Sequence, residues 1–160
     1  MSRATDEDLF TRTVSTLSPR MYADLIGKPF REKACGPDAY GCVGLLVEVQ
    51  RRLGHTLPEY AQDEAALWAA LGELGEWERV PIPQGGDGVL LRSSDPPWHV
   101  GVLIDQRHML HAHPHAGVVV ERIDGPMYCR RIEGFYRCRG LGTDSPMSQK
   151  RDMGHPGTPR

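Results

Sequence analysis

The second half of the chain carries five short apolar runs separated by turn residues, and this pattern constrains the fold more than any other feature of the sequence. The runs cover residues 89–91, 100–104, 108–111, 117–123 and 132–136. Short apolar runs bounded by Gly, Pro and Asp predict β-strands. The first half instead shows apolar residues at helical spacing. Helices followed by strands predict an α+β fold with a small antiparallel sheet.

Four helical segments are expected in the first half. Three of them cover residues 6–17, 20–26 and 59–74. The fourth begins at an N-cap, Asp38, and ends at Gly54. Apolar residues recur along it at helical spacing, namely Leu45, Leu46, Val49 and Leu53.

Length and composition bound the classes of function. The 160 residues suffice for one domain with an ordinary core, and the net charge of −2 gives no reason to invoke nucleic acid. No apolar run is long enough to span a membrane. Residues 1–8 are acidic and lack the apolar segment of a secretory signal, so we expect synthesis in a reducing cytoplasm. The expected organisation is an N-terminal extension (1–18), one domain (19–140) and a polar, flexible tail (141–160).

The four cysteines do not form a recognisable metal or disulfide framework. They are Cys35, Cys42, Cys129 and Cys138, and their spacing contains no pair of Cys-x-x-Cys units. Cys129 and Cys138 lie in apolar, strand-like surroundings, which predicts two small core residues. A shared metal or iron–sulfur site is the alternative.

Cys42 differs from the other cysteines because it stands near the start of the fourth helical pattern. The thiolate is the reactive form of cysteine, and both a helix N-terminus and a nearby imidazolium lower the pKa of a thiol. Gly41 and Gly44 are expected to leave room for a substrate chain. A buried structural cysteine is the alternative.

His99 and His111 are the candidate partners of that thiol. If residues 105–107 form a hairpin loop, Gly101 pairs with His111 and the two histidines share one face of the sheet. One imidazole then serves as base and the other holds its tautomer, as in a catalytic triad. The alternative is a divalent metal held by alternating histidines, namely His108, His111, His113 and His115.

Six motifs in one order carry a resemblance to a known family. They are DLIGKPF with GPDAY (24–30 and 36–40), CVGL (42–45), GGDGVL (85–90), HVGV (99–102), LHA (110–112) and IEGFYR (132–137). In this order and spacing, the segment from Met21 to Arg137 resembles an NlpC-type cell-wall cysteine peptidase. The branch it resembles is encoded with the tails of long-tailed phages and related prophages.

The resemblance implies a papain-like core in which the nucleophile's helix packs on an antiparallel sheet. It assigns Cys42 as nucleophile, His99 as general base and acid, and His111 as orienter. The oxyanion would be held in part by the backbone N–H of Cys42. The implied reaction is cleavage of peptide or amide bonds in peptidoglycan stem peptides, and it needs no metal or organic cofactor.

The resemblance also implies a setting and an alternative role. The expected place of action is the tail tip of a virion, where the chain would contact other tail-tip or hub proteins and cut the wall during infection. The chain departs from the usual family pattern at Phe30, Gly41 and Val43, where Tyr, Asp or Asn, and Ser, Trp or Ala are common. A structural tail-tip subunit with weak or vestigial activity is therefore the alternative function.

Overall fold

A computed structural model describes residues 15–57, 67, 76–93 and 98–139 of the chain. Two 3₁₀-helices come first, η1 (Pro19–Met21) and η2 (Ala23–Leu25), followed by the α-helix α2 (Cys42–Arg52). The strands are β1 (Trp77–Val80), β2 (Gly88–Arg92), β3 (Trp98–Leu103), β4 (His108–His113), β5 (Gly117–Arg122) and β6 (Ile132–Cys138). The order of helices before strands confirms the predicted α+β fold.

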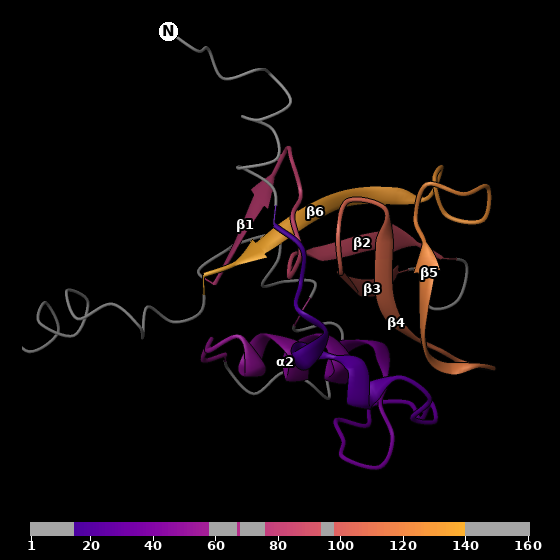
Figure 1. The fold of residues 1–160 in the computed structure, drawn as a ribbon. Coiled ribbons are helices and arrows are strands. Elements are labelled where there is room, and N and C mark those ends of the chain that lie inside the picture. Colours follow the sequence, from indigo (N-terminus) through magenta and orange to yellow (C-terminus); the bar gives the residue numbers. More distant parts are fainter. Residues whose placement is uncertain (1–14, 58–66, 68–75, 94–97, 140–160) are drawn as a thin grey trace, which may run out of the picture.

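All strand pairs of the sheet are antiparallel, in the order β1-β6-β2-β3-β4-β5. Helix α2 lies against one face of this sheet and packs on β3 and β4 (Figure 1). Leu45 and Leu46 of α2 share an apolar cluster with Val100, Val102 and Leu110 of the sheet. A second cluster contains the alternate residues of the same strands, such as Val89, Leu91, Leu103 and Met109. Both faces of the central strands are therefore buried.

The β3–β4 hairpin fixes the relative positions of the two candidate histidines. Val102 pairs with Leu110, which is the register predicted from a three-residue loop at 105–107. Asp105 closes the loop, because its Oδ1 accepts the backbone N–H of His108 at 2.8 Å. The predicted hairpin is confirmed, and side chains two residues apart along these strands share a face.

Helix α2 begins later than predicted. Its N-cap is Gly41, so Asp38 is not the cap. The backbone of Tyr40 pairs with that of Phe30, and residues 36–38 form a bend rather than a helical turn. This tertiary contact outweighs the local preference of Asp for an N-cap. As a result Cys42 is the first residue of the helix.

The end of α2, the other predicted helices and the predicted tail can each be compared with the structure. Gly54 ends α2 as predicted, with a φ of 96° that favours glycine. Residues 20–26 form parts of two 3₁₀-helices rather than one helical turn. The predicted helix at 6–17 falls mostly outside the described residues, and its last three residues are not helical. Of the predicted helix at 59–74 only Leu67 is described, and it is helical and buried. The predicted tail, 141–160, lies outside the described residues.

Two predictions about the end of the sheet are corrected by the structure. Strand β1 was not predicted, because its central residues, Glu78 and Arg79, are charged and exposed. It forms by pairing with β6 at the sheet edge. Cys129 is exposed in the turn segment before β6 rather than in the core, whereas Cys138 is buried as predicted.

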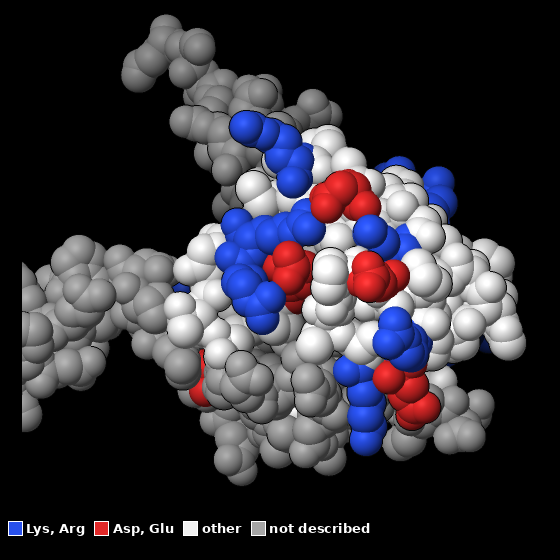
Figure 2. Space-filling view, turned by 90° about the horizontal axis from the view of Figure 1, so that it is seen from below, with Lys and Arg blue, Asp and Glu red and all other residues white. Residues whose placement is uncertain are grey.

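The surface on the α2 side mixes both signs of charge. Figure 2 shows acidic side chains lying among the basic ones on this face. Arg52 of α2, for example, pairs with Glu48 at 2.9 Å and with Asp24 at 2.6 Å. In the described part of the chain, no helix has the length and apolar character needed to cross a bilayer.

Candidate active site

Cys42 occupies the first helical position of α2, where the helix dipole favours an anion. Its side chain belongs to the cluster between the helix and the sheet, and the residue is 6% exposed. Because α2 packs on β3 and β4, the helix that begins at Cys42 lies against the two strands that carry His99 and His111.

The structure brings the two candidate histidines into direct contact. Nε2 of His99, on β3, lies 2.8 Å from Nδ1 of His111, on β4. The two rings are nearly perpendicular, with an interplanar angle of 77°. His111 is 1% exposed, so this contact is shielded from water on one side. A hydrogen bond between two imidazoles in this setting can fix which ring nitrogen of each carries a proton.

Gly101 allows this close packing of the hairpin. A Cβ at this position would lie 2.9 Å from Sδ of Met109 and 3.3 Å from Cβ of His111. Any other residue would push the β4 side chains away. The glycine in the HVGV motif is therefore explained by the approach of His111.

A further polar group at the site was not predicted from the sequence. Glu121, on β5, places Oε2 at 3.0 Å from Nε2 of His111. It lies opposite Met109 in the β4–β5 register, and alternation along β5 then turns Glu121 to the face that carries His111. The sequence signal would have been a second hairpin loop at residues 114–116, followed by this alternation.

Burial keeps both imidazoles in their neutral form at neutral pH. Desolvation lowers the pKa of His99 to about 3, and its interactions with His111, Arg131 and His113 lower it further. Desolvation also lowers the pKa of His111, although Glu121 opposes this shift through its hydrogen bond and its charge. His99 is therefore available as a proton acceptor.

The glycines beside Cys42 have a different role from the predicted one. A Cβ on Gly44 would collide with the carbonyl oxygen of Ala34 and lie 2.8 Å from Cα of Cys35. A Cβ on Gly41 would lie 2.9 Å from the backbone N of Lys33. These glycines let the loop at residues 31–35 pack on the start of α2, and the space beside them is filled by that loop rather than open to substrate.

The histidine-rich stretch gives no support to the metal alternative. Among the described residues, no three His, Cys, Asp or Glu side chains are grouped so as to hold a metal ion. His108 is engaged with the Asp105 carboxylate at 3.0 Å, and His113 Nδ1 accepts the backbone N–H of His115 at 3.0 Å. These side chains are therefore committed to the two hairpin loops.

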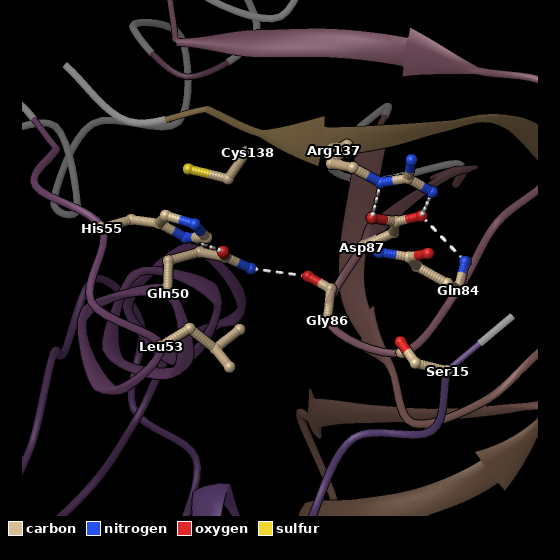
Figure 3. Close-up of a pocket in the computed structure, with 10 residues that line it drawn as sticks. Ser15, Gln50, Leu53, His55, Gln84, Gly86, Asp87, Arg137 and Cys138 are labelled. Atoms are coloured by element: carbon tan, nitrogen blue, oxygen red, sulfur yellow. Dashed lines mark hydrogen bonds and ion pairs between the residues drawn. The ribbon is translucent and has the colours of Figure 1, made fainter. Parts of the chain in front are cut away.

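A cavity of about 310 Å³ lies at the other end of α2 from Cys42. Its polar groups bind one another (Figure 3): Gln50 donates to the carbonyl oxygen of Gly86 at 2.8 Å, and Arg137 holds Asp87 through two bonds of 2.9 Å. His55 lies 2.9 Å from the Gln50 side chain. This network ties α2 to β2 and β6, and we assign it a structural role.

Comparison with known proteins relates the chain to solved structures of one kind. A Staphylococcus aureus protein described as similar to a lipoprotein of the NLP/P60 family superposes with a TM-score of 0.56 at 18% identity, over 85% of this chain and 43% of that one. NlpC1 from Trichomonas vaginalis gives 0.55 at 21% identity, over 74% and 41%. The NlpC/p60 domain of the peptidoglycan hydrolase SagA gives 0.52 at 18% identity, over 72% and 92%.

These likenesses establish the fold, and the chain spans less than half the length of the S. aureus and T. vaginalis proteins. A search of curated proteins gave no match. The NlpC/P60 family itself matches residues 27–137, which is more than half of the chain and includes Cys42, His99, His111 and Glu121. On the strength of that match, this chain belongs to the NlpC/P60 family.

Proposed function

We propose that this protein is a cysteine peptidase that cleaves peptide or amide bonds in the stem peptides of peptidoglycan. In this proposal Cys42 is the nucleophile, His99 the general base and acid, and His111 the orienter. The observation that carries it is the 2.8 Å contact between His99 Nε2 and His111 Nδ1, on strands against which the Cys42 helix packs. Family membership and the likeness to a peptidoglycan hydrolase domain support the same reaction and substrate.

The reaction would proceed in two halves. The Cys42 thiol gives its proton to His99, and the thiolate attacks the carbonyl carbon so that a C–S bond forms and the carbonyl electron pair moves to oxygen. The helix N-terminus and the backbone N–H of Cys42 would stabilise this oxyanion. When the C–N bond breaks, the His99 imidazolium protonates the leaving amine. His99 then takes a proton from water, which hydrolyses the thioester and returns the thiol.

The test is release of new amino groups from purified peptidoglycan, with mass spectrometry of the soluble fragments. The wild-type protein and Cys42→Ala are compared with Cys138→Ala, because Cys138 is equally buried, at 5% exposed, and lies on β6. We expect release by the wild type and by Cys138→Ala but not by Cys42→Ala. Equal release by Cys42→Ala and wild type would contradict the nucleophile assignment.

A structural subunit with vestigial activity is the competing function. The contact between His99 and His111 argues for catalysis, because a fully buried imidazole and a partly buried one cost desolvation free energy that an apolar pair would not. Absence of release by both the wild type and Cys42→Ala, with the fold intact by circular dichroism, would favour the structural subunit.

We also propose that the protein acts at a phage tail tip, together with tail-tip or hub proteins, and cuts the wall during infection. The support is the resemblance of the motifs between Met21 and Arg137 to the phage-tail branch. Mass spectrometry of purified particles tests this: we expect peptides of the chain in tails. Their presence only in the soluble fraction of the host would contradict a place in the virion.

A further inference from the structure

The polar contacts at the site continue beyond the two histidines. His111 Nε2 lies 3.0 Å from Glu121 Oε2. Burial raises the pKa of Tyr128, and the nearby Glu121 carboxylate raises it further. The ring of Tyr128 also packs edge-on against His111, with 5.7 Å between centroids. Glu121 thus contacts His111 of β4 and lies near Tyr128 of the turn segment that follows β5.

The order of these contacts fixes where the protons lie. An ionised carboxylate only accepts hydrogen bonds, so the His111 nitrogen that faces Glu121, Nε2, carries the proton. In neutral His111 the other nitrogen, Nδ1, is then an acceptor and receives Nε2–H of His99. In neutral His99 this leaves Nδ1 with its lone pair. Nδ1 is therefore the nitrogen of His99 that can take a proton from a thiol.

We propose that Glu121 is a positioning residue of this site, which holds His111 as the Nε2–H tautomer and so keeps Nδ1 of His99 ready to accept the proton of Cys42. This inference rests on the proposed function for the role of Cys42. The tautomer of His111, however, is a property of the protein itself and can be measured without any substrate.

The charges around the histidines give Glu121 a second effect. Several basic groups surround His111. They are His99 on β3, His113 on β4 and Arg131 on the segment before β6. Glu121 on β5 supplies a negative charge that acts on His111 and also on the neutral Tyr128 hydroxyl. The carboxylate therefore stabilises the positive charge that forms when the pair takes a proton from the thiol.

Without the Glu121 carboxylate, His111 would no longer be held in its Nε2–H tautomer. Without Glu121, His111 can carry its proton on Nδ1 and donate it to Nε2 of His99. Neutral His99 would then carry its own proton on Nδ1, and this nitrogen could no longer act as a base. A wrong tautomer of a catalytic histidine lowers the turnover number rather than the affinity for substrate.

The experiment uses the full chain with ¹⁵N-labelled histidine. Glu121→Ala and Glu121→Gln are compared with Glu78→Gln, a carboxylate on edge strand β1 that pairs with Arg139. The ¹⁵N shifts of His111 report its tautomer, and kcat and KM are measured on soluble muropeptides. In the wild type and in Glu78→Gln we expect His111 protonated on Nε2. In Glu121→Ala we expect a shift towards Nδ1–H, with kcat lower by about 10- to 100-fold and KM within about twofold.

Glu121→Gln keeps the shape of the side chain but removes its charge. This variant therefore tests the effect of the charge even if Glu121→Ala does not fold. Burial lowers the pKa of His111 and the Glu121 carboxylate opposes this shift, so loss of the carboxylate should move the acidic limb of the pH profile of kcat to lower pH. An unchanged His111 tautomer in Glu121→Ala, or an unchanged pH profile in Glu121→Gln, would overturn the assignment. A wild type without hydrolytic activity contradicts the proposed function instead, and the tautomer shift still decides the role of Glu121.

Discussion

At the level of single residues, the site depends on two imidazoles that burial keeps neutral. The pKa of His99 is lowered to about 3 mainly by desolvation, so the resting site does not hold a stable imidazolium. Protonation of His99 then belongs to the reaction, when the thiol gives up its proton, and the contact with His111 spreads the resulting charge. The catalytic cost of losing each histidine should therefore differ.

We expect His99→Ala to lower kcat/KM by about 10³-fold or more and His111→Ala by about 10- to 100-fold. His99 exchanges the proton itself, whereas His111 acts through His99. Steady-state kinetics on muropeptides measure both values, and His115→Ala serves as control because His115 is exposed on the β4–β5 loop. Equal rates for all three variants would rule out the proposed roles.

The buried His99 should also make the fold sensitive to acid. The unfolded chain binds a proton on this histidine below about pH 6.5, whereas the folded protein does so only near pH 3. Acidification through this window favours the unfolded state, by up to about 1.4 kcal/mol per pH unit for one proton. Urea titrations between pH 7 and pH 4 should show a smaller decrease of the unfolding free energy in His99→Gln than in the wild type. Parallel decreases would contradict the depressed pKa.

At the level of elements, short-range and long-range features differ in how far the sequence predicts them. The β3–β4 register was predictable because a short loop at 105–107 leaves little freedom in the pairing of its strands. The start of α2 was not predictable, because a contact between Tyr40 and Phe30 overrides the capping preference of Asp38.

The candidate site shows the same division. His99 and His111 could be placed together from one hairpin, and the structure finds them in contact. Glu121 was missed because its place depends on a second register, between β4 and β5, and on a face of β5 that the apolar run at 117–120 does not distinguish. The prediction that Gly44 leaves room for substrate was wrong. The loop that packs on Gly44 lies earlier in the chain, and its sequence has no helical or strand pattern.

Gly44 supports a prediction about the loop that packs on the start of α2. Alanine stabilises an isolated helix by about 1 kcal/mol relative to glycine. Here the added Cβ would collide with the carbonyl oxygen of Ala34, and we expect a net destabilisation of about 1–3 kcal/mol. Thermal unfolding of Gly44→Ala measures this, with Gly125→Ala as control because a Cβ at Gly125 meets no atom within 4 Å. A more stable Gly44→Ala would show that the loop does not pack as described.

At the level of the whole molecule, a partly buried ion pair beside the end of α2 remote from Cys42 joins the loop before β2 to β6. Asp87 is 2% exposed and accepts two hydrogen bonds from Arg137, 50 positions later in the chain. This contact requires β6 to lie beside β2, an order that the sequence does not specify. The pair therefore supports the sheet on which the candidate site is built without taking part in its chemistry.

We expect Asp87→Asn to lower the unfolding free energy by about 2 kcal/mol, because it leaves the charge of Arg137 partly buried and uncompensated. The kcat of the folded fraction should not change. Urea unfolding and muropeptide kinetics measure the two effects. The exposed pair of Asp124 and Arg122 offers a control, and Asp124→Asn should leave both quantities unaltered. Loss of kcat at full folding in Asp87→Asn would show that this end of the molecule belongs to the site.

The proposed reaction requires that the Cys42 thiol becomes acylated with the help of His99. The most direct measurement is acid quenching of the wild-type protein during turnover of a muropeptide, followed by peptide mass spectrometry. We expect an acyl fragment of the stem peptide attached to Cys42, and a much slower appearance of this adduct in His99→Ala. Turnover with the acyl group on another residue, or adduct formation at the same rate in His99→Ala, would contradict the proposed reaction.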